Sequence, residues 1–114
     1  MSFEKELAHA RSSRLEGNEG RARVCARRAA GMAVGEFLAR QGFNRISNSA
    51  YDRLDFLRNI PDQDPAIITL VDHFLMQVTS EHTLPVNIDL ISEVLRLVQV
   101  LDLDKSESQG DTHI

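Results

Sequence analysis

The stretch that decides the fold is residues 15–41, LEGNEGRARVCARRAAGMAVGEFLARQ. Residues 17–20, Gly-Asn-Glu-Gly, are typical of one helix ending and the next beginning, and Gly17 suits the left-handed position after a helix. The segment that follows has no proline, and its small apolar residues are mostly alanine. Gly31 and Gly35 lie one turn apart within it, and each costs a helix interior about 1 kcal/mol relative to alanine. The pattern predicts a central helix over 19–41 that a neighbouring helix approaches closely at these glycines.

Around this segment, the sequence predicts four more helices. Apolar residues recur at three- and four-residue spacing over the ranges 3–16, 48–59, 65–79 and 88–102. The expected start signals are Ser2, Ser47 or Asn48, Asp64 followed by Pro65, and Asn87. Residues 67–71 alone could form a strand, but the residues after them continue the helical pattern. We therefore predict an all-α, up-and-down bundle of four longer helices and one short helix.

The length and composition narrow the class of protein. The 114 residues are the size of one domain, which we place at 1–103, with 104–114 predicted to be a disordered tail because it has no apolar pattern. The single cysteine excludes an internal disulfide and a thiolate metal cage. No apolar run approaches the roughly 20 residues of a membrane span, and the charged start does not resemble a signal peptide. These features predict a cytoplasmic protein without a membrane partner.

Charge is distributed unevenly along the chain. Residues 1–58 hold eleven Lys and Arg against seven Asp and Glu, a net charge of +4, whereas residues 59–114 hold two against ten, a net charge of −8. A basic half can be a nucleic-acid surface. Opposed halves can also attract each other, within one chain or across a dimer, and arginine is well suited to pairing with carboxylates. We favour the second interpretation.

Residues 15–33 resemble the opening of the HEPN family, whose members begin with an amphipathic helix, a Gly-Asn turn and a long alanine-rich helix at the centre of a four- or five-helix bundle. The resemblance covers about residues 4–40. It implies a homodimer, and it implies a nucleotidyltransferase-like protein as a partner. Tetratricopeptide helix pairs use a similar turn, but no second copy of a 34-residue unit is present here.

The resemblance also supplies a test for catalysis, because HEPN ribonucleases carry an arginine followed, after four to six residues, by a histidine. The four histidines are at positions 9, 73, 82 and 113, and none has an arginine at the required distance before it. The pair Arg58-Asn59 resembles the start of the motif, but the histidine positions hold Gln63, Asp64 and Pro65. We therefore predict a non-catalytic chain with no catalytic residues. Because His73 and His82 are too far apart for a helical metal pair and no Gly-rich phosphate loop is present, we also predict no metal-binding or cofactor-binding residues and no cofactor.

Two groups of residues are candidates for binding. Arg23, Arg27 and Arg28 could contact RNA, a phosphate or a protein partner, or could instead pair with Glu16, Glu19 or the acidic second half. The last predicted helix is apolar over more than half its circumference, so it is either buried centrally or meets a second chain. If it meets a second chain, we predict that the dimer interface is formed by one apolar row of this helix: Leu90, Val94, Leu97 and Leu101. The alanine-rich helix is the alternative interface.

Three further residues are interpreted as core. Cys25 could be a reactive thiol beside arginines, but a lone cysteine in an alanine-rich helix is more typical of packing. Tyr51 and Phe56 are likewise expected in the core rather than as stacking platforms. The function predicted is a non-enzymatic, homodimeric interaction module. The alternatives are an RNA- or nucleotide-binding domain, or degenerate ribonuclease, using the arginine-rich second helix, and a structural subunit of a larger assembly.

Overall fold

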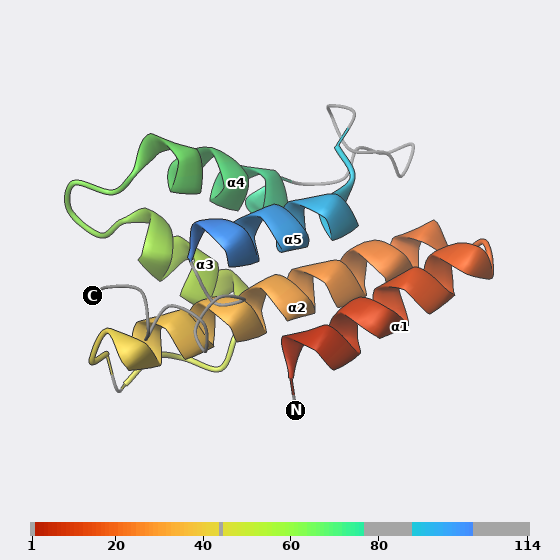
Figure 1. Ribbon diagram of the computed structural model, residues 1–114, viewed down its shortest axis with the longest axis horizontal. Coiled ribbons are helices and arrows are strands. Elements are labelled where there is room, and N and C mark those ends of the chain that lie inside the picture. Colours follow the sequence, from red (N-terminus) through yellow and green to blue (C-terminus); the bar gives the residue numbers. More distant parts are fainter. Residues whose placement is uncertain (1, 44, 77–87, 102–114) are drawn as a thin grey trace, which may run out of the picture.

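The computed structural model describes residues 2–43, 45–76 and 88–101. Those residues form five helices and no strand: α1 (Phe3–Leu15), α2 (Glu19–Arg40), α3 (Ala50–Arg58), α4 (Pro65–Leu75) and α5 (Leu90–Val100). Helices α1 and α2 form an antiparallel pair, α5 lies along α2, and α4 packs on α3 and α5 (Figure 1). The predicted all-α bundle is confirmed. The predicted tail 104–114, the cap Asn87 and the end of the predicted helix 65–79 lie outside the described residues.

Helix ends follow local side-chain chemistry. Ser2 Oγ accepts the Lys5 N–H at the start of α1, and Gly17 after that helix has φ of 83°. Asp64 caps α4 and is followed by Pro65. The predicted cap of α3 was wrong, because the cap is Ser49, whose Oγ accepts the Asp52 N–H, and not Ser47 or Asn48. Helix α5 begins at Leu90 and is capped by Asp89.

Helix α2 is central because its small residues allow three helices to approach it, namely α1, α3 and α5. Five of its alanines are fully buried: Ala22, Ala26, Ala29, Ala30 and Ala33. At Gly31, a Cβ atom would lie 2.5 Å from the Ala50 Cβ and 2.7 Å from the Ala50 Cα, so the first turn of α3 rests directly on this glycine. At Gly35 the close neighbour is the Arg53 guanidinium. The close approach of a helix backbone predicted at the two glycines is therefore present at Gly31, whereas at Gly35 a side chain of α3 occupies the space.

Helix α3 buries less than predicted. Leu54 and Leu57 are in the core, but Tyr51 is 59 % exposed and Phe56 is 37 % exposed. The core interpretation of these two aromatic residues was wrong. The reason is that α3 is short and covers α2 with one face only, which leaves Tyr51 at its start largely exposed to solvent. Phe56 packs instead against Phe43 in an edge-to-face pair with ring centroids 5.1 Å apart.

Candidate functional site

The three arginines singled out on α2 lie in different surroundings. Arg27 is half-buried, and its Nε donates to the Phe74 carbonyl oxygen at 2.7 Å. Burial, with the nearby positive charge of Arg23, lowers the pKa of Arg27. Because Phe74 lies in the last turn of α4, this contact places a cation at the negative end of that helix. Arg27 therefore joins α2 to α4.

Arg23 and Arg28 also lie in different surroundings. The positive charge of Arg23 helps the Arg14 hydrogen bond to lower the pKa of Glu19, so Arg23 belongs to the charge network at the start of α2. Arg28 is exposed, and its side chain has no hydrogen bond or ion pair with any residue of the described ranges. The structure does not gather the three arginines at one site. Arg28 lines the cavity between α2 and the start of α3.

That cavity has a volume of about 480 Å³ and lies between α2 and the start of α3. Arg28 and Met32 line it from α2, and Asn48, Tyr51 and Arg53 line it from the segment that enters and begins α3. Its shape depends on the Gly31–Ala50 contact, which fixes the start of α3 against α2.

Arg53 is the residue of this cavity that the sequence analysis missed. Its guanidinium donates to three neutral acceptors, the Ser47 carbonyl at 2.8 Å, the Gly31 carbonyl at 3.3 Å and Asn48 Oδ1 at 3.3 Å. The sequence held one weak signal for it, because Gly35 leaves on α2 the space that the guanidinium fills. Nothing in the sequence pairs the two positions.

A second depression, an apolar groove of about 400 Å³, runs between α1 and α5. Phe3, Leu7, Leu95 and Val98 supply its apolar lining, and Glu4 and Arg11 on α1 also line it. Leu95 is 43 % exposed.

The row predicted for a dimer interface lies elsewhere on α5. Leu90, Val94, Leu97 and Leu101 are each at most 5 % exposed, because they face α2 and the core of their own chain. Of the two explanations for the wide apolar face, central burial accounts for this row. The exposed large apolar side chains of α5 include Leu95 instead.

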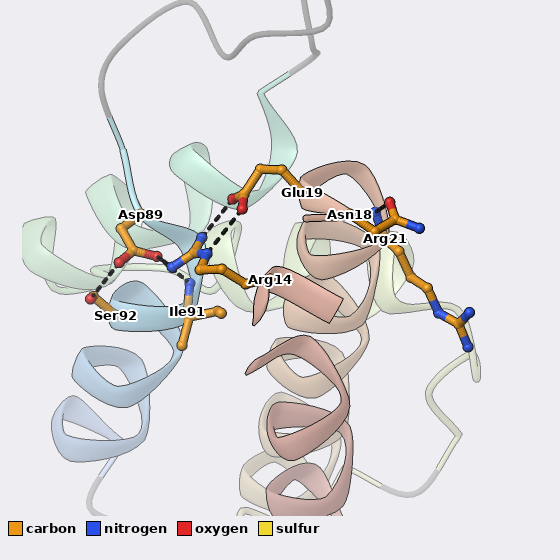
Figure 2. Close-up of polar contacts among 7 residues, drawn as sticks. All are labelled: Arg14, Asn18, Glu19, Arg21, Asp89, Ile91 and Ser92. Carbon is orange, nitrogen blue, oxygen red and sulfur yellow. Dashed lines mark hydrogen bonds and ion pairs between the residues drawn. The ribbon is translucent and has the colours of Figure 1, made fainter. Parts of the chain in front are cut away.

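Opposite charges from the two halves of the chain meet within the bundle. Arg14 lies 2.9 Å from Asp89, and Arg58 contacts Asp72 through two hydrogen bonds of 2.5 and 3.2 Å. Figure 2 shows Arg14 between Asp89 and Glu19, with Arg21 pointing away from this cluster. The Arg58 hydrogen bond lowers the pKa of Asp72. The basic first half and the acidic second half of the sequence thus form ion pairs with each other within one chain.

The structure also places the remaining candidate residues. Cys25 is buried, as the packing interpretation predicts. Within the described ranges, no three His, Cys, Asp or Glu side chains gather as metal ligands. None of the helices in that part of the chain is long and apolar enough to cross a membrane. Comparison with family models, with curated proteins and with solved structures found no match to this chain.

Proposed function

We propose that this chain is a non-enzymatic, HEPN-like interaction module that forms a homodimer through the groove between α1 and α5. The observation that carries the proposal is the groove itself, in which Leu95 is exposed beside the apolar side chains of Phe3 and Leu7. Because Leu95 is 43 % exposed, burying the rest of its side chain against a second chain contributes about 1 kcal/mol, which is less than half of the value for a fully exposed leucine. The buried row of α5 holds the bundle together, and the adjoining groove is left for a partner.

Charge complementarity argues for a second copy as that partner. Glu4 and Arg11 are seven residues apart on α1, so they lie on one face of the helix, two turns from each other. Neither side chain has a hydrogen bond or ion pair with the rest of the described chain. In a two-fold symmetric dimer, residue i of one copy meets residue j of the other and the reverse. Two antiparallel α1 helices would therefore place each Glu4 opposite an Arg11.

The nucleotidyltransferase partner implied by the resemblance is a separate expectation. Such a partner would give a complex of two different chains, with a mass distinct from twice 12.8 kDa. RNA binding through α2 is the weaker alternative, because the Arg27 guanidinium is already bound to Phe74 and half-buried.

Sedimentation equilibrium of the purified chain tests the homodimer. We expect a mass near twice 12.8 kDa for the wild type and a monomer for Leu95→Glu, because a carboxylate cannot be buried in an apolar contact without a partner. The matched control is Val24→Glu, since Val24 on α2 is 45 % exposed but lies outside the groove. A monomeric wild type at high micromolar concentration would refute the dimer. Equal dissociation of both variants would refute the groove as its interface.

A further inference from the structure

The cavity between α2 and α3 contains two cations whose charge no described carboxylate neutralises. Arg28 has no described partner, and all three acceptors of Arg53 are neutral oxygens. A guanidinium has five N–H donors, so Arg53 keeps two of them beyond its three contacts. Asp52, the acidic residue in the first turn of α3, does not line the cavity. The cavity is therefore a place where an anion would meet two arginines and no lining carboxylate.

The backbone adds donors to the same cavity. Ala50 and Tyr51 are the first two residues of α3 and both line the cavity, yet neither N–H has an acceptor within the described part of the chain. The next N–H, of Asp52, is occupied by Ser49 Oγ. Free N–H groups at a helix start favour phosphate, and arginine is suited to phosphate because its planar donors match two oxygens.

The remaining lining indicates what the anion carries. Tyr51 lines the cavity and is 59 % exposed, so its ring is accessible from solvent. Met32 and Ala50 add apolar surface beside it. A volume of about 480 Å³ falls in the range of small-molecule sites and holds more than a phosphate ion alone. A flat ring attached to the phosphate could stack on Tyr51, as aromatic pairs do.

We propose that this cavity binds a small phosphate monoester bearing a planar ring, with the phosphate held by Arg28, Arg53 and the first N–H groups of α3, and with the ring against Tyr51. The site does not depend on the dimer, because all of its residues belong to α2, α3 and the segment between them. We therefore expect Leu95→Glu, the variant of the groove between α1 and α5, to leave phosphate monoester binding in this cavity unchanged.

The test is a titration of the ¹⁵N-labelled chain followed by NMR, with phenyl phosphate as the probe and inorganic phosphate as the ring-free comparison, at constant ionic strength and pH 7.5. We expect saturating shifts of the Ala50 and Tyr51 amide signals. Replacing Arg28→Gln should weaken phenyl phosphate binding about tenfold, since a hydrogen bond to a charged group contributes on the order of one such factor or more. Tyr51→Leu should remove the preference for phenyl phosphate over inorganic phosphate while leaving inorganic phosphate binding unchanged.

The matched control is Arg21→Gln. Arg21 lies on the same helix and points away from its neighbours, and it does not line the cavity (Figure 2). Its replacement should leave binding unchanged. Equal weakening by Arg21→Gln and Arg28→Gln would show general charge attraction and overturn the site. Shifts that never saturate, or binding of a single-stranded RNA without binding of phenyl phosphate, would also overturn it.

Discussion

The Arg14 guanidinium, in the last turn of α1, lies 2.9 Å from the carboxylate of Asp89, which caps the start of α5. The same guanidinium donates two further hydrogen bonds, of 3.0 and 2.6 Å, to Glu19 in the first turn of α2 (Figure 2). Arg14 thus connects the turn between α1 and α2 to the start of α5, since Asp89 lies 75 residues further along the chain. Asp89 in turn accepts hydrogen bonds from the Ile91 N–H and the Ser92 hydroxyl.

Two replacements of Asp89 separate its role as a cap from its role in the ion pair. Asp89→Ala removes both, and we expect a loss of about 1 to 2 kcal/mol, mostly from the cap. Asp89→Asn keeps a side-chain oxygen for the Ile91 N–H and loses only the charge, so it should cost less than about 1 kcal/mol, as exposed ion pairs do. Urea unfolding of both variants measures these losses in the free energy of unfolding. Equal losses would show that the ion pair, rather than the cap, supplies the stability.

Acid should weaken the bundle in a defined pH range. The Arg14 hydrogen bond lowers the pKa of Glu19; for Asp89, burial raises the pKa, but hydrogen bonds from Arg14 and Ser92 outweigh it and the net shift is downward. A carboxyl whose pKa is lower when folded stabilises fully above its unfolded pKa, near 4, and loses that contribution as the pH falls through its folded pKa.

We therefore expect the urea midpoint of the wild type to fall as the pH decreases below about 4, and to fall less steeply in Arg14→Gln. Measurements at constant ionic strength avoid changes in screening. Because both carboxylates are about half exposed, each contribution should be small. The same pH slope in the wild type and in Arg14→Gln would contradict the assignment.

Much of the fold could be predicted because its signals are local. Gly17, Ser2 and Asp64 act within one turn of themselves, and the helix end at Gly17 and the helix starts at Ser2 and Asp64 are predicted correctly. The cap of α3 was harder to predict, because Ser47, Asn48 and Ser49 can all accept an N–H, and only the path of the chain selects Ser49. Local chemistry therefore fixed that a helix begins there, but not at which residue.

The candidate site depended on contacts between distant residues, and the sequence could not supply these. Three arginines within one turn and a half of α2 appeared to form a single surface, but the position of α4 draws Arg27 to Phe74 and leaves Arg28 beside α3. In the same way, the apolar width of α5 was visible, but which of its rows meets α2 depends on packing. Tyr51 was misassigned for the same reason.

The two glycines of α2 should respond differently to alanine. At Gly31 the new Cβ would meet the Ala50 backbone, so α3 must shift, at a cost of about 1 to 3 kcal/mol that exceeds the helix propensity gain of about 1 kcal/mol. At Gly35 it would meet only the end of the Arg53 side chain, which can move aside. We expect Gly31→Ala to lower the thermal unfolding midpoint and Gly35→Ala to leave it nearly unchanged. The reverse order would contradict the packing described for α3.

A polar contact between α4 and α5 should show strong coupling. His73 Nδ1 lies 2.5 Å from Glu93 Oε1, and Glu93 is buried, with the Arg96 guanidinium 4.0 Å away as its other ionic neighbour. His73→Leu alone leaves the buried Glu93 carboxylate without its nearest partner and should lower the free energy of unfolding by about 1 to 3 kcal/mol. The double variant His73→Leu with Glu93→Leu removes both polar groups and should cost less than the sum of the single losses. If urea unfolding gives the double variant a loss equal to the sum of the two single losses, the two side chains are not coupled.

Charge exchange on α1 tests the proposed dimer geometry more strictly than loss of Leu95. In the antiparallel arrangement each Glu4 faces an Arg11 of the other copy, so Glu4→Arg places two arginines together at both ends, and Arg11→Glu places two glutamates together. Each single variant should raise the dimer dissociation constant several-fold at low salt, since like charges across an interface repel. The double variant exchanges the two charges and restores the pairing, so its dissociation constant should return close to that of the wild type. Sedimentation equilibrium at low and at high salt measures all four proteins, and the differences should shrink at high salt because exposed charges are screened. A double variant that dissociates more readily than either single variant would show that Glu4 and Arg11 do not face each other across a two-fold axis.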